Sequence, residues 1–370
     1  MHPTGPIARR FPLVARIRPA CLPLEARVDK LCELADAGTR QADPGLASTV
    51  FNQAALLASD LGLPDYAREL CRRHAHLYLN LGPLPPTSAI RGLEPVVNLA
   101  RLHIRAGHHE QGHQLLLDLY QAVTTGAGTV LDGVTIPAHL TETHQQRAEV
   151  RKWLWRVVLA DGTRALTTTG RWHDAMRHLQ EHRGIGLRML DGRQVAVLAR
   201  ATTGDTAGAL ALLEATEPGE PWENAVTAVL TALCRPGHQH TAATAIDHCL
   251  SLQPTAGLDL FTTRLALTAA EAASDDRGAA GGPLLDSLIR RMSESGDGYA
   301  LREILAHPPA RARLKPTEAN ALEQALHACA LDSGELPEPT QAQLWEALGH
   351  ATNVLESAPI NRCTPGAGPA

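Results

Sequence analysis

The chain has 370 residues, of which 44% are hydrophobic, 20% are charged and 3% are aromatic, and its formal net charge is −5. This length allows a sizeable core in one long domain or two ordinary ones. The negative net charge disfavours a nucleic-acid-binding protein, because such proteins neutralise phosphates with lysine and arginine. The scarcity of aromatic residues and of alternating β-branched runs predicts an all-α protein.

Residues 1–24 are basic and proline-containing, and we expect them to form a flexible arm. This segment lacks an apolar stretch long enough for a signal peptide, and no window of the chain approaches 18 apolar residues. Seven cysteines are scattered along the chain without a C-x-x-C motif, which is typical of reduced thiols. We therefore expect a cytoplasmic protein that does not contact a membrane. All but three of the 34 basic residues are arginines, which is typical of a high-GC bacterial genome.

Residues 25–252 contain one local pattern five times: an apolar helical run, a glycine, and a small residue five positions later. The copies are "LASDLGLPDYARELC", "LHIRAGHHEQGHQLL", "LTTTGRWHDAMRHL", "RATTGDTAGALALL" and "LCRPGHQHTAATAI". Their glycines are Gly62, Gly107, Gly170, Gly204 and Gly237, with separations of 45, 63, 34 and 33 residues. A glycine can end a helix in the left-handed conformation, and a small residue lets the next helix approach closely. The pattern predicts antiparallel helix pairs joined by short turns.

The last two separations are close to the 34-residue period of tetratricopeptide repeats. Trp172, two residues after its glycine, and Pro221, at the end of a copy, also fit that consensus. Residues 25–252 therefore resemble a tetratricopeptide-like array. The resemblance implies an α-solenoid, a curved stack of antiparallel helix pairs whose concave face binds ligands.

Three segments depart from the repeated pattern. Residues 124–140 are an insertion whose glycine-rich turns indicate a short hairpin or an extended loop, and one long helix follows, weakened near Asp161. Residues 253–357 predict further, less regular helices that extend or cap the stack. Residues 358–370 form a tail rich in proline and glycine that we expect to be disordered.

His109, Glu110 and His113 form an H-E-x-x-H motif, in which a continuous helix places two imidazoles on one face to bind zinc. The repeated pattern instead predicts that residues 108–111 form the turn between two helices. The two histidines would then not lie one turn apart within a helix, and no third ligand with suitable spacing follows. We therefore expect neither a zinc site nor another cofactor.

Two groups of polar residues are candidate binding sites. Asn98 and Arg101 are three positions apart in an apolar run, so they share a helix face that could line a concave groove. Arg183, Arg188 and Arg193 lie in a glycine-containing segment, and a basic turn of this kind can hold a phosphate or a carboxylate. The alternatives are an exposed polar stripe for the first group and solvated loop arginines for the second.

Helical repeats offer a large surface without chemistry of their own, so we expect an interaction module that binds a protein or peptide partner through its concave face. The alternative is an all-α transferase of bacterial specialised metabolism. Such an enzyme would transfer a group to a small-molecule acceptor, in one version from an aminoacyl-tRNA. A third hypothesis is the sensor part of a regulator. The first 40 residues contain no convincing helix-turn-helix pattern, so we expect no direct binding to DNA.

Overall fold

The structure is a computed structural model that describes residues 1–273 and 281–358. In these residues the regular structure is helical apart from one two-stranded hairpin, which confirms the all-α prediction. No helix in this part of the chain combines the length and the apolar character needed to cross a bilayer. The tail predicted to be disordered lies outside the described residues from residue 359 onward.

The chain forms two compact units, each assembled from separate segments. Unit 1 consists of Met1–Leu24 and Leu166–Leu331, and unit 2 consists of Glu25–Ala165 and the chain from Asp332 onward. The boundary between the units, at residues 165 and 166, falls within the helix Thr163–Thr167. The predicted array of residues 25–252 is therefore divided at this helix and does not end at residue 252. The helices on either side of residue 252 pack on each other within unit 1.

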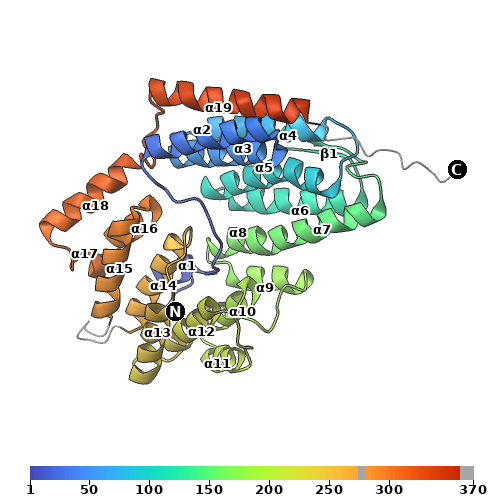
Figure 1. Ribbon diagram of the computed structural model, residues 1–370. Helices are drawn as coiled ribbons and strands as arrows, with labels where there is room; N and C mark the ends of the chain where they lie inside the picture. The colour runs from blue at the N-terminus through green and yellow to red at the C-terminus, as the bar shows by residue number, and fades with distance from the viewer. Residues whose placement is uncertain (274–280, 359–370) are drawn as a thin grey trace. The chain divides into compact units, whose positions relative to one another are not determined.

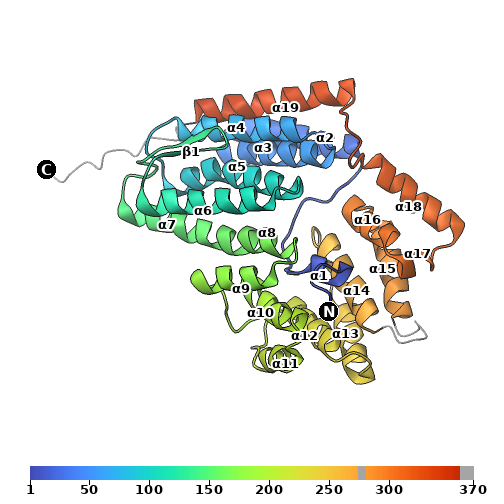
Figure 2. The same cartoon turned by 180° about the vertical axis from the view of Figure 1, so that it is seen from behind.

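Unit 2 is built from helices that pack on their neighbours in the sequence (Figure 1). Its elements are α2 (Leu24–Gln41), α3 (Pro44–Asp60), α4 (Pro64–Leu79), α5 (Pro86–Arg105), α6 (His109–Thr125), β1 (Thr129–Leu131), β2 (Val134–Ile136), α7 (His144–Val157) and α19 (Glu338–Ser357). Each of α3 to α6 packs on the next helix, and α5 also contacts α3 and α7, so these three helices form one layer. The C-terminal helix α19 lies along α3 and α4 (Figure 2).

The turns between helices have the conformation that the repeated glycines predict. All five glycines have φ between 75° and 86°. In the first four copies the residue after the glycine donates its N–H to the carbonyl five positions earlier, as Leu63 does to Ala58 and His108 to His103. The small residues of these four copies are buried, whereas Ala242 of the fifth is half-buried. The pattern therefore marks helix ends and close helix contacts.

The insertion forms a hairpin, one of the two forms that its turn residues predict. Strands β1 and β2 pair antiparallel, and Asp132 and Gly133 at the tip both have positive φ. Arg72 on α4 holds the tip through its Nη2, which donates to Asp132 Oδ1 at 2.8 Å. The long helix that follows is continuous but contains a π-helical turn, η1 (Val158–Gly162), between α7 and α8 (Thr163–Thr167). The predicted weak point near Asp161 is therefore this π-helical turn.

Unit 1 also consists of helices packed on their sequence neighbours. They are α1 (Pro6–Arg10), α9 (Trp172–Glu181), α10 (Asp191–Thr202), α11 (Thr206–Glu214), α12 (Pro221–Cys234), α13 (Gln239–Ser251), α14 (Asp259–Ala272), α15 (Gly282–Ser295), α16 (Gly298–Ala306), α17 (Pro308–Arg311) and α18 (Pro316–Ala328). From α9 to α15 each helix contacts the next. α16 packs between α14 and α18, which ends the regular succession.

The expectation that residues 1–24 form a flexible arm is corrected, because this segment packs into unit 1. Its buried side chains include Ala8, Phe11, Leu13 and Cys21. Arg10 Nη2 donates to Glu271 Oε1 at 2.9 Å, and His307 Nε2 lies 2.8 Å from the same oxygen. Burial alone would raise the pKa of Glu271, but the hydrogen bonds from His307 and Arg10 hold it below its usual value. Arg10, one of the basic residues that suggested a free arm, thus belongs to a partly buried ion pair.

Candidate functional site

The H-E-x-x-H motif lies at the beginning of α6. The prediction that residues 108–111 form a turn is wrong, because His108 is the N-cap and the helix begins at His109. The turn is short because it consists of the C-cap Ala106, Gly107 with φ 86° and the N-cap His108. His109 and His113 are therefore one turn apart in a helix. Within the described residues, however, no group of three or more histidine, cysteine or acidic side chains is arranged to hold a metal ion.

Gly112 inside this motif has a packing role. A Cβ at this position would lie 2.6 Å from the carbonyl oxygen of Ala100 and 2.6 Å from Cγ1 of Ile104, both on α5. Real Cβ atoms essentially never show such distances. Glycine therefore allows the backbone of α6 to approach α5 this closely.

Asn98 and Arg101 form part of a connected row of polar side chains on α3, α5 and the π-helical turn. We call this row the polar ladder and define it as Asn52, Glu94, Asn98, Arg101 and Asp161. Asn52 Nδ2 donates to Glu94 Oε2 at 3.1 Å, and Asn98 Nδ2 donates to Asn52 Oδ1 at 3.1 Å. Arg101 donates to Asn98 Oδ1 at 2.9 Å and to Asp161 Oδ2 at 2.8 Å. The structure thus brings the two predicted residues together through one hydrogen bond.

The polar ladder is partly open to solvent. The Arg101 side chain is 52% exposed and that of Asp161 is 14% exposed. Asn52, Glu94 and Asn98 are half-buried. Burial raises the pKa of Glu94, partly offset by the hydrogen bond from Asn52 and by the charges of Arg101 and Arg91. The ladder therefore offers amide and guanidinium groups at a surface whose carboxylates are already held by protein partners.

A separate and more buried group of ion pairs lies beyond the ladder, near the end of α5. Asp60 at the end of α3 accepts hydrogen bonds from Arg27 at 2.6 Å and from Arg105 at 2.9 Å. The Asp60 side chain is only 3% exposed, whereas that of Arg105 is 46% exposed. Because Asp60 accepts hydrogen bonds from both arginines, this group of ion pairs holds α2, α3 and α5 together.

The three arginines predicted to form a basic turn have separate surroundings in unit 1. Arg188 Nε donates to Oε2 of the buried Glu223 at 3.0 Å, and its Nη2 donates to the other carboxylate oxygen. Arg193 is buried and donates to the carbonyl oxygen of Leu212 at 2.7 Å. Arg183 is exposed. The contacts of Arg188 and Arg193 join parts of unit 1 and give no indication of a shared anion site.

Arg183 occupies the position that glycine has in the five turns of the repeated pattern. Its φ is 52°, and the following Gly184 donates its N–H to the carbonyl of Leu179 at 2.7 Å. Holding a residue with a side chain in the left-handed region costs about 1 to 2 kcal/mol. Glycine avoids this cost, but its greater conformational freedom stabilises the unfolded chain and offsets part of the gain. We expect Arg183→Gly to increase the free energy of unfolding by up to about 1 kcal/mol, measured by urea denaturation. A loss of stability would show that the Arg183 side chain makes stabilising contacts.

Sequence reasoning did not find Asn52, Glu94 or Asp161. Glu94 carries a recognisable signal, because it precedes Asn98 by four positions and Arg101 by seven, on the same helix face. Asn52 and Asp161 lie 46 and 60 positions from their partners on α5, so no local spacing points to them.

The chain matches no protein-family model, no curated protein and no solved structure.

Proposed function

We propose that unit 2 is a tetratricopeptide-like stack that binds a protein or peptide partner on the side formed by α3, α5 and α7. Contacts between alternate helices support this proposal, because α5 contacts both α3 and α7. Helices on the inner side of a curved stack lie closer together than those on the outer side. The inner side of the proposed stack is then the layer that carries the polar ladder.

The proposal rests on three polar side chains that are partly exposed and linked by hydrogen bonds across α3 and α5. They are Asn52, Asn98 and Arg101. Amide and guanidinium groups can hydrogen-bond the backbone or carboxylates of an extended chain. Each of these three side chains is held in place by another ladder residue, which lowers the entropy cost of ordering it on binding. The ladder therefore suits recognition of a polypeptide segment.

The proposal includes a cytoplasmic location. Of the six cysteines among the described residues, five are buried and Cys32 is half-buried. This arrangement is compatible with a reducing compartment.

A peptide-display selection against the purified full chain tests the proposal. Peptides that are enriched would be synthesised, and their dissociation constants measured by fluorescence anisotropy with the wild type, Asn98→Ala and Arg101→Gln. We expect each substitution to weaken binding by about three- to thirtyfold, the range for losing one hydrogen bond to a neutral or charged group. The matched control is Gln114→Ala, which removes an exposed amide from α6 outside the ladder layer.

Circular dichroism melting would verify that the variants remain folded. If the enriched peptides bind all four proteins equally, the ladder does not form the binding surface and the proposal is wrong. If Gln114→Ala alone weakens binding, the partner docks on the opposite layer.

A further inference from the structure

Residues 1–22, which we call the N-terminal segment, cross unit 1 as a separate piece of chain. After the short helix α1 beside α14, this part of the described chain has no further helix or strand before α2 (Figure 1). Near the beginning of the segment, Trp172 Nε1 on α9 donates to the carbonyl of Pro3 at 2.8 Å. Near its end, Gly298 of α16 donates its N–H to the carbonyl of Cys21 at 2.8 Å. The segment therefore lies across helices that are far apart in the sequence, as a bound peptide would.

The backbone of the N-terminal segment is held by a buried amide. Gln194 of α10 is fully buried, and its Nε2 donates to the carbonyl of Leu13 at 2.7 Å. The Oε1 of the same amide accepts the N–H of Leu13 at 2.7 Å. Nε2 also donates to the carbonyl of Met189 at 3.2 Å, which fixes the orientation of the amide. Hydrogen bonds to main-chain groups give affinity for an extended chain whatever its side chains are.

Two carboxylates of unit 1 pair with arginines of the N-terminal segment. Glu271 of α14 accepts a hydrogen bond from Arg10 at 2.9 Å, and Asp191 of α10 accepts one from Arg16 at 2.8 Å. The Arg10 side chain is nearly buried, whereas that of Arg16 is exposed. Hydrogen bonds between charged groups are stronger than those between neutral ones. Unit 1 is thus acidic where the segment is basic, so the two are electrostatically complementary.

Apolar and aromatic contacts add to this complementarity. The side chains of Phe11 and Leu13 are buried in unit 1. Arg18 donates its N–H to the carbonyl of Gly257 at 3.2 Å, and its guanidinium carbon lies 4.0 Å from the centroid of the Tyr299 ring. A guanidinium is attracted to the face of an aromatic ring. Together the contacts favour an extended segment that alternates arginines with large apolar residues.

We infer that the surface of unit 1 beneath the N-terminal segment is a binding site for extended, arginine-containing peptides. In this structure the chain's own segment occupies the site, where it competes with a segment of the same chemistry from a partner protein. Replacement can begin near Ile17, which is 78% exposed. The site shares no residue with the polar ladder, so this inference does not depend on the proposed function. We call this site the receiving surface and define it as Asp191, Gln194, Glu271 and Tyr299.

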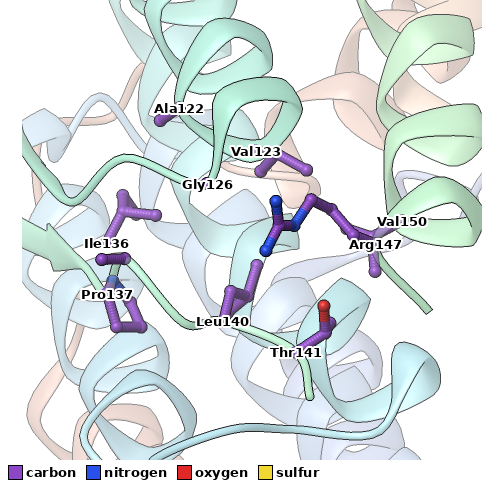
Figure 3. Close-up of a pocket in the computed structure, with 10 residues that line it drawn as sticks. Ala122, Val123, Gly126, Ile136, Pro137, Leu140, Thr141, Arg147 and Val150 are labelled. Atoms are coloured by element: carbon purple, nitrogen blue, oxygen red, sulfur yellow. The ribbon is translucent and has the colours of Figure 1, made fainter. Parts of the chain in front are cut away.

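The hollow in unit 2 between α6 and α7 is too small to bind such a segment (Figure 3). Leu140, Arg147 and Val150 are among the residues that line it, and its interior has room for about one water molecule. An added peptide is therefore expected to bind the receiving surface of unit 1 rather than this hollow.

A full chain with a protease recognition sequence inserted after the exposed Pro23 tests the inference. Cleavage there leaves the N-terminal segment on unit 1 without a covalent link. A fluorescent synthetic peptide of residues 1–22 is then added, and its anisotropy reports whether it replaces the cleaved segment. The uncleaved protein is the matched control, because its tethered segment competes at an effective concentration of roughly millimolar.

We expect saturable binding of the peptide to the cleaved protein, and binding at least tenfold weaker to the uncleaved protein. A peptide with Arg10→Gln should bind the cleaved protein at least tenfold more weakly than the natural peptide, because it loses the charged hydrogen bond to Glu271. A peptide with Arg9→Gln is the control and should bind like the natural one, because Arg9 is exposed.

Three results would overturn the inference. Equal binding to the cleaved and uncleaved proteins, or equal binding of the Arg10→Gln peptide, would place the peptide elsewhere. Failure of the peptide to enter the cleaved protein would show that the segment is a permanent part of the core, and so would loss of helical circular dichroism after cleavage and dilution. A dimer of the uncleaved protein in size-exclusion chromatography would overturn the choice of partner, because a second copy of the chain would then supply the segment.

Discussion

Lowering the pH from 7.5 to 5 is expected to reduce the free energy of unfolding of unit 2 by about 2 kcal/mol through His74 alone. This side chain is 1% exposed and lies between two aromatic rings, 5.1 Å from the ring of Phe51 and 5.8 Å from that of Tyr78. Its Nε2 has no hydrogen-bond partner among the described residues. Burial without a compensating charge lowers the pKa of His74 from 6.5 to about 3.

The direction of the effect follows from proton uptake by the two states. The unfolded chain takes up a proton on His74 below about pH 6.5, whereas the folded protein does so only near pH 3. The unfolded state therefore binds more protons between these values, and stability falls as the pH falls. The contribution of a neutral His74 is fully present above pH 6.5 and is lost progressively toward pH 3.

Two phenylalanine variants separate this effect from the titration of other groups. His74→Phe keeps an aromatic ring beside Phe51 but cannot be protonated, so we expect its urea midpoint to fall less than that of the wild type between pH 7.5 and pH 5. His76→Phe is the matched control, because His76 is exposed on the same helix. This variant should retain the acid sensitivity of the wild type. Equal acid sensitivity of His74→Phe and the wild type would contradict the assigned role of His74.

The parts of the fold that were predicted correctly depend on local chain properties. The left-handed φ of Gly62 and Gly107 follows from residues next to them in the sequence, and so does the confirmed helical content. The position of residues 1–24 depends on Arg10 meeting Glu271, which is 261 positions away. Such a long-range partner leaves no periodic signal in one sequence, so a basic, proline-containing segment resembled a free arm.

The same distinction applies to the candidate sites. Asn98 and Arg101 could be paired from their spacing because one helix carries both. The partner of Arg188 is a glutamate 35 positions away on α12, so this arginine is engaged in a tertiary contact that the sequence did not show. The H-E-x-x-H motif was assigned to a turn because its glycines matched the repeated pattern, yet α6 begins one residue after the N-cap His108. A motif placed at a helix boundary is sensitive to an error of a few residues.

Gly112→Ala is expected to reduce the free energy of unfolding by about 1 to 2 kcal/mol, although alanine is the better helix former. The new methyl group would lie 2.6 Å from the carbonyl oxygen of Ala100, so α5 and α6 would have to separate. Backbone atoms cannot move aside as the end of a flexible side chain can. This cost exceeds the gain of about 1 kcal/mol that alanine provides over glycine inside a helix.

Gly349→Ala on α19 is the matched control for this prediction, because a Cβ at Gly349 would meet no atom within 4 Å. There the helix propensity acts alone, and we expect an increase in stability of about 0.5 to 1 kcal/mol. Urea denaturation followed by circular dichroism would compare both variants with the wild type. Opposite signs would show that close packing, rather than backbone conformation, requires glycine at position 112. If Gly112→Ala instead stabilises the protein to the same degree as Gly349→Ala, α5 and α6 are not packed as closely as the structure places them.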